Sequence, residues 1–334
     1  MRRAFRTRGD AVNAQLQWPL VSVVIPARNE AELIGVVVRS VTAQSSRAEA
    51  IEVIVVDDGS TDDTVRLARD AGARIIEATQ AGQKGNAAAA RNLGAAQSRG
   101  DPLIFLDADC VAAPGWLEQL LRGHELGATV VGGSLDLPPG LPVTARCDFY
   151  CSWYLIHPRA RAGRIPHHPP ANISVRREPF QSTSGYATHA PFYFTNEERF
   201  WQGELMSRGH WFYFQPEARV THHHHAGFVP LLRRNYRWGY TAVEAKSTTG
   251  VARMAWLYRY PWLVILASPL LVIAHTVFIV ACWLRARVFE PLALLPLIFA
   301  SRLAYVAGMC AGAVRWMQFK RNPAAGVQVR RRWD

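Results

Sequence analysis

Cysteine is scarce in this chain of 334 residues, and its placement excludes the common cysteine-based architectures. Five cysteines are present without zinc-type pairing: Cys147 and Cys151 lie four residues apart, but no second pair completes a metal site. Two others, Cys282 and Cys310, lie in apolar segments. We therefore expect free thiols in a reducing compartment rather than a disulfide framework.

Acidic residues are also in short supply. There are 26 Asp and Glu against 38 Lys and Arg, which gives a net charge of +12. Such an excess fits nucleic acid, an anionic membrane surface or phosphorylated ligands as partners. Much of the positive charge clusters near apolar C-terminal stretches, which favours the membrane over nucleic acid. The basic segment 1–19 lacks the apolar core of a secretory signal, so we expect the domain after it to stay in the cytoplasm.

From residue 20 onward, short apolar runs alternate with helical patterns, which is typical of βαβ units and a parallel sheet. Four such units are predicted, with strands at 20–26, 51–56, 73–78 and 102–110, and the first helix at Asn29–Gln44. Residues 140–170 have no clear period and are expected to form an irregular insertion. Regular structure resumes with the helical pattern 195–209 and with a strand pair in HWFYFQPEARVTH. No internal repeat at a fixed period is found.

Two long apolar segments lie near the C-terminus. Residues 261–284 carry no charge, and residues 291–314 are interrupted only by Arg302. Each has 24 residues, which at about 1.5 Å per residue is enough to cross a hydrocarbon core of roughly 30 Å. We expect a transmembrane hairpin in which Arg302 faces the partner helix or a polar pocket, because a charge in mid-bilayer is costly. A tilted or partly interfacial second segment is the alternative.

The segment 226–258 precedes this hairpin and carries an apolar stripe with cationic flanks, which is typical of a helix in the membrane interface; an ordinary surface helix is the alternative. The basic residues that flank the hairpin on the catalytic side are Arg253, Arg259, Arg315, Lys320 and Arg321. The outer loop carries only Arg285 and Arg287, so the positive-inside bias predicts a multi-pass inner-membrane protein whose catalytic domain and C-terminus lie in the cytoplasm. The expected organisation is 1–19 basic segment, 20–225 catalytic domain, 226–258 interface region, 259–315 two transmembrane helices and 316–334 basic tail.

Acidic residues gather at the ends of predicted strands. Asp58 follows the second strand, and Asp107 and Asp109 follow the fourth. Carboxylates at the carboxyl ends of parallel strands point into the ligand crevice of open α/β folds. Two acids one residue apart are able to hold a hard divalent cation, which neutralises a diphosphate. Alone, an Asp-x-Asp triplet is weak evidence, because acidic loops are common.

Four blocks in order, VSVVIPARNE, VIVVDDGSTDDT, GNAAAARNLGAA and IFLDADC, resemble the family 2 glycosyltransferases of the GT-A fold. The resemblance covers roughly residues 20–240 and implies a Rossmann-like, mostly parallel α/β catalytic domain that uses a nucleoside-diphosphate sugar. It implies that Asp107 approaches the ribose side of the donor and that Asp109 binds Mn²⁺ or Mg²⁺. The donor-binding residues implied by the four blocks are Pro26, Asn29, Glu30, Asp58, Arg91 and Asp107.

Two later blocks, NEERFWQGELMSRG and FQPEARVTH, resemble the Glu-Asp motif of the family and its downstream strand. Counting back from PEARV places Glu198 where the family has its base, usually Asp, and Glu197 is the fallback. Inverting transfer needs one carboxylate to take the proton of the acceptor hydroxyl. The alternative is a solvated acid at a helix start.

The remaining site predictions concern the metal, the leaving diphosphate and the acceptor. His222 opens a run of four histidines and matches a position where related enzymes place a His near the metal, so a third ligand is expected there. Arg234, Arg237 and Trp238 resemble the QxxRW motif of processive members, with Arg234 in place of Gln; contact with lipid phosphates is the alternative role. Asn172, in a block that resembles the acceptor-side strand, is assigned to the acceptor.

Together these patterns predict an inverting, metal-dependent glycosyltransferase that acts on a lipid or lipid-linked acceptor at the cytoplasmic membrane face. One alternative is a membrane-anchored nucleotidyltransferase, which would have a Gly-rich phosphate loop after the first strand, where this chain has ARNE. Another is a non-catalytic membrane protein that binds nucleotide-sugars. The sequence does not identify the sugar, the nucleotide or the acceptor.

Overall fold

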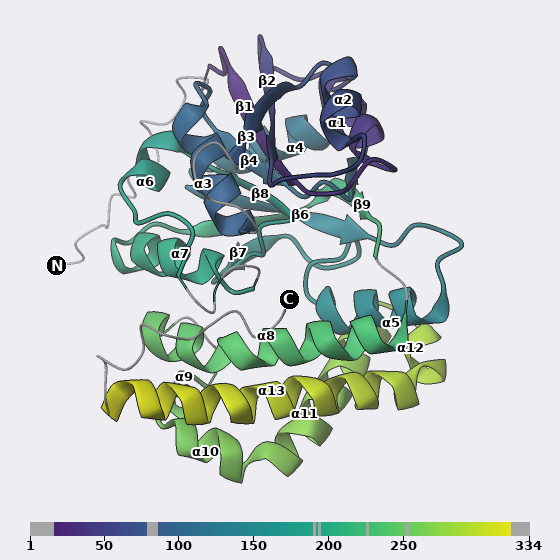
Figure 1. The fold of residues 1–334 in the computed structure, drawn as a ribbon, viewed down its shortest axis with the longest axis vertical. Coiled ribbons are helices and arrows are strands. Elements are labelled where there is room, and N and C mark those ends of the chain that lie inside the picture. The colour runs from purple at the N-terminus through teal and green to yellow at the C-terminus, as the bar shows by residue number, and fades with distance from the viewer. Residues whose placement is uncertain are drawn as a thin grey trace, which may run out of the picture.

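The buried apolar runs of the first half of the chain form the parallel part of one sheet. The computed structural model describes residues 17–78, 86–189, 192, 195–224, 227–250 and 254–321, and within them nine strands pair in the order β3-β2-β1-β4-β8-β6-β9-β5, with β7 beside β9 (Figure 1). The strands are β1 Val21–Ala27, β2 Ile51–Asp57, β3 Arg74–Glu77, β4 Leu103–Leu106, β5 Cys110–Ala112, β6 Val130–Asp136, β7 Gly163–Ile165, β8 Asn172–Val175 and β9 Phe212–His222.

Strands β3, β2, β1 and β4 are all parallel, and the sheet becomes mixed beyond β4. There β8 runs antiparallel to both β4 and β6, and β9 returns parallel to β6. This mostly parallel α/β architecture confirms the predicted fold class. It brings the carboxyl ends of β1, β2 and β4 to one edge, where a ligand crevice forms in open α/β sheets.

Within the described residues, seven helices accompany the strands: α1 Ile34–Thr42, α2 Thr64–Asp70, α3 Ala87–Gln97, α4 Trp116–Glu125, α5 Val143–Ser152, α6 Arg177–Gln181 and α7 Glu198–Ser207, of which α5 packs against the C-terminal helices. Alternate residues of β1 pack on opposite faces of the sheet. Val23 joins a cluster with Val37 of α1 and Leu120 of α4, whereas Val24 joins a cluster with Ala88 of α3 and Trp201 of α7. Because both faces are covered, the parallel strands are continuous apolar runs.

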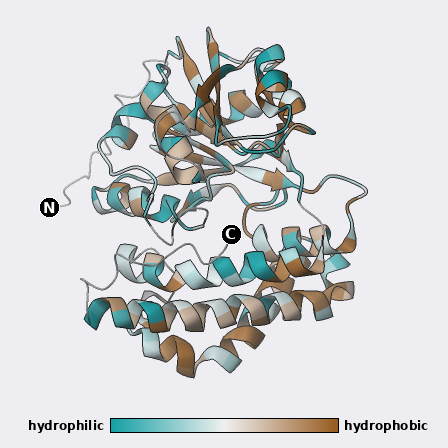
Figure 2. Ribbon diagram, in the orientation of Figure 1, coloured by the Kyte–Doolittle hydropathy of each residue, from teal (hydrophilic) through white to brown (hydrophobic). Residues whose placement is uncertain are grey.

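The C-terminal part forms a separate layer of helices, which we call the helix layer (residues 228–321). It comprises α8 Phe228–Thr249, α9 Ala255–Arg259, α10 Pro261–Leu266, α11 Ser268–Arg285, α12 Glu290–Ala293 and α13 Leu295–Arg321. In Figure 1, α8 lies between the sheet domain and α13, with α10 and α11 on the far side. Hydropathy colouring shows apolar residues concentrated on α10, α11 and part of α13 (Figure 2).

Glycines allow α8 and α13 to pack at unusually close range. A Cβ atom added at Gly239 would lie 1.9 Å from the carbonyl oxygen of Tyr305, and one at Gly312 would lie 2.0 Å from that of Tyr240. Gly308 and Gly312 form a GxxxG pattern on α13, of the kind that lets helix backbones approach in membranes. The predicted interface helix is therefore held on one side by α13, and it buries Leu231, Gly239 and Val243.

Two helices of the helix layer are long and apolar enough to cross a membrane: α11, with 18 residues, and α13, with 27. The first predicted span, residues 261–284, consists of two helices in the structure, because α10 ends at Leu266 and α11 begins at Ser268, just before Pro269. Proline near the start of a helix lacks the N–H that would continue the preceding one. The expectation for Arg302 is confirmed: its side chain is buried, hydrogen-bonds to Asn235 Oδ1 on α8 and lines a polar cavity.

Three other sequence predictions need correction. The first helix begins at Ile34 rather than Asn29, because Asn29 has a left-handed backbone with φ of 55°. The insertion 140–170 is not irregular, since it contains α5 and β7. The predicted strand pair is the single strand β9, which accommodates Pro216 because its register with β6 shifts at that point. Within the predicted segments 1–19 and 316–334, residues 1–16 and 322–334 lie outside the described residues, as does Arg253.

Candidate active site

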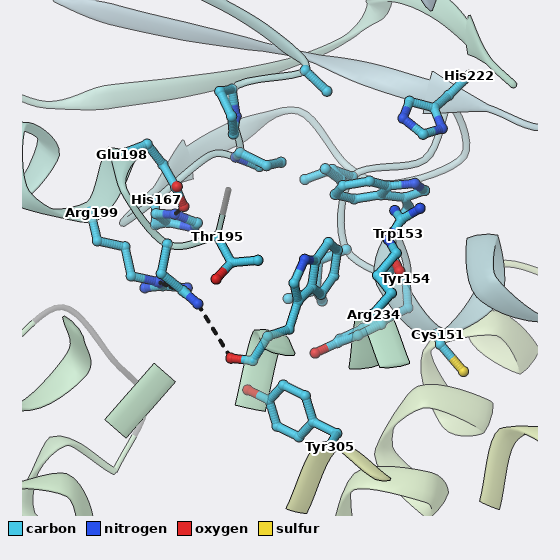
Figure 3. Close-up of a pocket in the computed structure, with 18 of the residues that line it drawn as sticks. Cys151, Trp153, Tyr154, His167, Thr195, Glu198, Arg199, His222, Arg234 and Tyr305 are labelled. Carbon is cyan, nitrogen blue, oxygen red and sulfur yellow. Dashed lines mark hydrogen bonds and ion pairs between the residues drawn. The ribbon is translucent and has the colours of Figure 1, made fainter. Parts of the chain in front are cut away.

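A cavity of about 450 Å³ lies between the carboxyl edge of the sheet and the helix layer. Its sheet side is acidic, with Asp107, Asp109, Glu197 and Glu198, and the helix layer contributes Lys246, His275, Phe278, Ile279, Arg302 and Tyr305. Figure 3 shows Glu198, His167 and Arg199 on one side of the cavity and Trp153 and His222 on the other. One space thus joins a carboxylate-rich end to a cationic and aromatic end.

Asp107 and Asp109 occupy the turn between β4 and β5, where the predicted Asp-x-Asp motif meets the cavity. The turn is closed by the Cys110 N–H, which donates to the Asp107 carbonyl at 3.1 Å. Asp107 Oδ1 accepts a hydrogen bond from Arg91 at 2.6 Å, and the same guanidinium donates to Glu197 Oε1 at 2.8 Å. Arg91, buried on α3, therefore fixes two carboxylates that approach the site from distant parts of the chain.

The register between β5 and β9 places Cys110 opposite His222 and so brings His222 beside Asp109. Ligand atoms of Asp109, Cys110 and His222 all lie within 4.8 Å of one another, and His222 Nε2 is 3.5 Å from Asp109 Oδ1. Burial lowers the pKa of His222, and its Nδ1 is a buried atom without a hydrogen-bond partner among the described residues. A neutral imidazole beside a carboxylate fits a divalent cation.

Glu197 and Glu198 are adjacent and buried at the start of α7, but their carboxylates face different partners. Burial and the neighbouring charge of Glu198 raise the pKa of Glu197, and the positive charge of Arg91 partly offsets this rise. Burial also raises the pKa of Glu198, and here the positive charge of Arg199 partly offsets the rise. The site thus contains two carboxyl groups that hold their protons more tightly than usual and that differ in what holds them.

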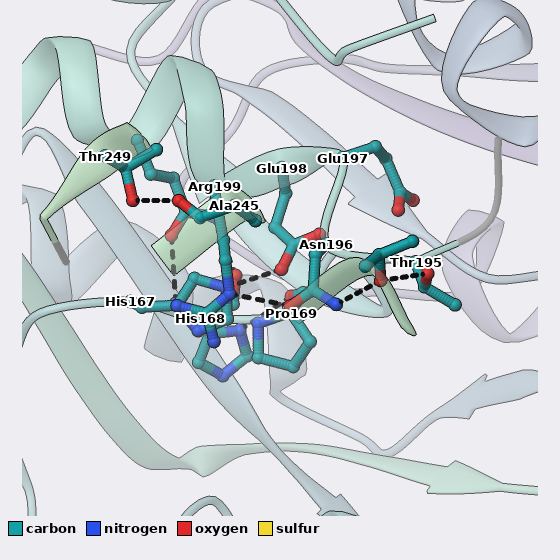
Figure 4. A network of polar contacts seen from close by, with 12 residues as sticks. His167, His168, Pro169, Thr195, Asn196, Glu197, Glu198, Arg199, Ala245 and Thr249 are labelled. Carbon is teal, nitrogen blue, oxygen red and sulfur yellow. Dashed lines mark hydrogen bonds and ion pairs between the residues drawn. The ribbon is translucent and has the colours of Figure 1, made fainter. Parts of the chain in front are cut away.

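His167 is the partner of Glu198, with its Nε2 2.5 Å from Glu198 Oε1, whereas the Glu197 carboxylate points away (Figure 4). Burial, with Arg199 and Lys246, lowers the pKa of His167 well below its ordinary value, so the imidazole is neutral. A hydrogen bond from neutral His167 to an ionised Glu198 requires the proton on Nε2. His167 was not predicted from the sequence, because it lies 31 positions before Glu198 and no local pattern pairs the two residues.

The loop that carries the two glutamates is attached to α8. Asn196 has a left-handed backbone with φ of 59°, and its Nδ2 donates to Thr241 Oγ1 of α8 at 2.8 Å. Thr195 and Thr241 share a further hydrogen bond between their hydroxyls at 2.7 Å. Figure 4 shows this attachment beside the contact between Glu198 and His167. The position of both glutamates therefore depends on α8.

Four predicted donor residues lie at the carboxyl ends of β1 and β2, outside the set that lines this cavity: Pro26, Asn29, Glu30 and Asp58. Asn29 Oδ1 accepts the Thr61 N–H at 2.8 Å, and Asp58 Oδ2 accepts the Asn86 N–H at 2.9 Å, so these side chains join neighbouring loops. Burial, with Asp109 and Asp107 nearby, raises the pKa of Glu30 to about 7. The negative charges of Asp107 and Asp109 at the acidic end of the cavity thus act on Glu30.

The predicted acceptor and diphosphate residues separate into two groups. Arg234 and Trp238 line the cavity, with the guanidinium of Arg234 5.1 Å from a ring centroid of Trp238, whereas Arg237 is not among the lining residues. Asn172 lies inside the sheet: its Nδ2 donates to the Ser134 and Ala218 carbonyls. Its Oδ1 accepts from Trp116 Nε1 at 2.8 Å, so its assignment to the acceptor is corrected to a role within the sheet.

A second network, also missed from sequence, supports the histidine side of the cavity. Asp148 of α5 is buried and accepts hydrogen bonds from His224 Nδ1 at 2.9 Å and from Arg234 at 2.8 Å. Trp153 Nε1 donates to His224 Nε2 at 2.9 Å. Asp148 was missed because the sequence of the segment 140–170 shows no helical periodicity, so α5 itself was not predicted. The network connects the end of β9 to α5 and α8.

The fold and the site, a mostly parallel α/β sheet with an Asp-x-Asp turn over a ligand cavity, define a glycosyltransferase of the GT-A class. The family model for glycosyl transferase family 2 matches residues 22–183. The chain is also 30% identical over 233 residues, 66% of its length and 72% of the relative, to glycosyltransferase AglE of Haloferax volcanii. The chain belongs to glycosyl transferase family 2.

Two further proteins extend the comparison. Undecaprenyl-phosphate 4-deoxy-4-formamido-L-arabinose transferase of Edwardsiella ictaluri is 30% identical over 171 residues, which cover 50% of this chain and 46% of the relative. A mannosyltransferase from Pyrobaculum calidifontis, solved in complex with GDP-Man and Mn²⁺, superposes with a TM-score of 0.55 at 17% identity and covers 91% of this chain and 88% of its own. This structural likeness supports the GT-A fold.

Proposed function

We propose that this enzyme transfers a sugar from a nucleoside-diphosphate sugar to a membrane lipid acceptor, with inversion, in a single displacement that depends on a divalent cation. The observation that carries the proposal is the single cavity that runs from Asp109 and Glu198 to the apolar and cationic wall of the helix layer. Such a cavity accommodates a charged donor at one end and an amphiphilic acceptor at the other.

The donor end is supported by the acidic turn and its neighbours. Asp109 and His222 are the residues we assign to the cation, with Asp107 beside them, and Asp58, Glu30, Asn29 and Pro26 to the nucleoside side. The mannosyltransferase solved with GDP-Man and Mn²⁺ supports this assignment. When bound, Mn²⁺ or Mg²⁺ neutralises charge on the departing diphosphate. The guanidinium of Arg234, at the cavity wall, supplies a second positive group for the diphosphate.

Glu198 is the residue that we assign as the base. Its neutral partner His167 leaves the carboxylate free to accept a proton, whereas Glu197 is held in an ion pair with Arg91. As the acceptor oxygen forms its bond to the anomeric carbon, its proton passes to Glu198. The bond from that carbon to the diphosphate oxygen breaks, and the electron pair leaves with the diphosphate.

The acceptor end is supported by the helix layer. Helices α11 and α13 have the length and composition of membrane spans, and α11 contributes Phe278 and Ile279 to the cavity wall. A relative named as an undecaprenyl-phosphate sugar transferase supports a lipid acceptor. From the basic residues Arg315, Lys320 and Arg321 at the end of α13, we place the catalytic domain on the cytoplasmic side of the inner membrane.

The test is transfer by the purified full-length chain in detergent. The enzyme is incubated with a panel of labelled nucleotide-sugars, a membrane lipid extract and either Mn²⁺ or a chelator. We expect label from at least one donor to enter the lipid fraction only with metal, and we expect Asp109→Asn to reduce that transfer at least about 100-fold. Transfer by Asp109→Asn at the wild-type rate, or equal transfer in chelator, would contradict the metal assignment.

A further inference from the structure

The helix-layer wall of the cavity carries two cations that form no ion pair with a carboxylate of the described residues. Lys246 of α8 donates to the hydroxyl groups of Tyr258 and Tyr305 at 3.2 and 3.4 Å. Arg302 of α13 is 4% exposed, hydrogen-bonds to Asn235 Oδ1, and has its guanidinium 5.0 Å from the ring centroid of Tyr305. A buried cation is costly unless an opposite charge compensates it.

Two other cations of these helices have carboxylate partners. Arg234 of α8 forms an ion pair with Asp148 at 2.8 Å, and Arg315 of α13 pairs with Glu244 of α8. The Nε atom of Arg302 is buried and has no hydrogen-bond partner among the described residues, and neither Arg302 nor Lys246 has a carboxylate partner there. The compensating charge for Lys246 and Arg302 is therefore expected from a ligand.

Both cations face the reaction space. Lys246, Arg302 and Tyr305 line the same cavity as Glu198. Arg199, the residue after Glu198, lines the same cavity. In Figure 3, Tyr305 lies at the helix-layer end of the cavity, across from Glu198 and His167. A molecule whose anionic group is bound here would extend toward the base.

The surroundings of the cations are apolar on the side of α11. Phe278 and Ile279 line the cavity there, and the outer face of the same helix exposes Leu270, Ile273 and Val277. An alkyl chain attached to the bound anion would meet the apolar side chains of this helix at the cavity wall. A small soluble anion would use none of it.

We propose that Lys246 and Arg302, with the hydroxyl group of Tyr305, form a subsite for the phosphate group of a phosphorylated lipid that serves as the acceptor. Ammonium, guanidinium and phenol groups together offer the donors that tetrahedral phosphate oxygens accept, and charge-assisted hydrogen bonds are the strong ones. The inference rests on the proposed function for its lipid acceptor. It adds that the acceptor is anionic and that helices α8 and α13 select it.

The experiment measures binding of dodecyl phosphate to the full-length protein in nanodiscs made only of zwitterionic lipid, by calorimetry. Dodecanol and inorganic phosphate are the comparison probes. We expect dodecyl phosphate to bind at least about tenfold more tightly than either, and we expect Lys246→Gln and Arg302→Gln each to weaken it about tenfold or more, as for loss of one charge-assisted hydrogen bond. Equal binding of inorganic phosphate would overturn the lipid source, and wild-type affinity in both variants would overturn the subsite.

Two controls keep these outcomes interpretable. Arg259→Gln removes an exposed cation of α9 and should leave binding unchanged, and Arg302→Lys keeps the charge and should retain most of it. Circular dichroism melting reports whether each variant is folded. Binding of nucleotide-sugar with Mn²⁺, measured on the same samples, tests the proposed function separately, because its loss would leave the phosphate subsite standing.

Discussion

The two walls of the cavity differ in how their charges are compensated. At the sheet edge, the buried carboxylates have protein partners: Arg91 joins Asp107 to Glu197, and His167 holds Glu198. This wall is organised by contacts within the protein, as preorganised catalytic groups are.

The helix-layer wall is organised differently. Its backbones are locked together by Gly239, Gly308 and Gly312, yet Lys246 and Arg302 lack carboxylate partners among the described residues. Rigid packing therefore coexists there with uncompensated charge. On the proposed function, this difference assigns the reaction to the sheet edge and recognition of the acceptor to the helix layer. Three changes test this division, and they are taken in order of expected effect.

The largest effect is expected from Glu198→Gln. The amide keeps the size of the side chain but cannot take a proton, so kcat should fall by about 10²–10⁴-fold. Steady-state transfer rates, with donor binding measured alongside, check this, and donor affinity should change little. Glu197→Gln is the matched variant. If Glu197→Gln lost more activity than Glu198→Gln, the assignment of the base would have to be exchanged between them.

A substitution within the helix layer is expected to lower the stability of the protein more than its rate of transfer. In Gly312→Ala, the added Cβ would meet the Tyr240 carbonyl at 2.0 Å, so α8 and α13 must separate. Overpacking of this kind costs about 1–3 kcal/mol. Thermal unfolding of the detergent-solubilised protein is the measurement. Val314→Ala, on an exposed position of the same helix, should stay within about 0.5 kcal/mol of wild type; equal melting of the two variants would mean that the close contact does not stabilise the layer.

The smallest effect is expected from His167→Ala, read as a pH profile. The base must be ionised, and burial raises the pKa of Glu198, so activity should be present at high pH and be lost as the pH falls through that raised pKa. Removing the His167 donor destabilises the ionised form further, which moves the acidic limb to higher pH. The other charged groups that act on Glu198 are Arg199, Arg91 and Asp107.

The measurement is kcat/KM from pH 5 to pH 9, and a shift of one pH unit corresponds to roughly a tenfold loss on the acidic limb. His167→Gln retains an N–H donor at a similar reach and should restore most of the wild-type profile. An unchanged profile in His167→Ala would remove His167 from the catalytic arrangement.

Much of the sheet edge could be predicted from sequence because its signals are local. Apolar runs such as that of β2 and the acids that follow them are contiguous in the chain, and strand direction then brings Asp58, Asp107 and Asp109 to one edge. The prediction of these acids needed only the period of the pattern and the rule for parallel sheets. His222, which the resemblance to related enzymes put near the metal, lies 3.5 Å from Asp109.

The helix layer was harder to predict because its contacts are long-range. The break before Pro269 could have been expected from the proline alone, but the apolar composition concealed it. The pairing of Gly239 with Tyr305 joins residues on separate helices, and neither glycine nor tyrosine signals it locally. For the same reason Asn172 was misassigned: its block was recognisable, but the direction of its side chain depends on three strands.

The attachment of Asn196 and Thr195 to Thr241 has a practical consequence for anyone who handles this enzyme. A fragment obtained by cutting the chain after residue 225 would keep the four donor-side blocks and the block that carries Glu197 and Glu198, yet it would lose the helix that fixes the loop before these two residues. On the proposed function, its donor-binding loops would be complete, but the position of its base would no longer be fixed. The helix layer would then be a component of the catalyst, and extraction of the full chain with detergent, rather than deletion of these helices, would be the route to an active preparation.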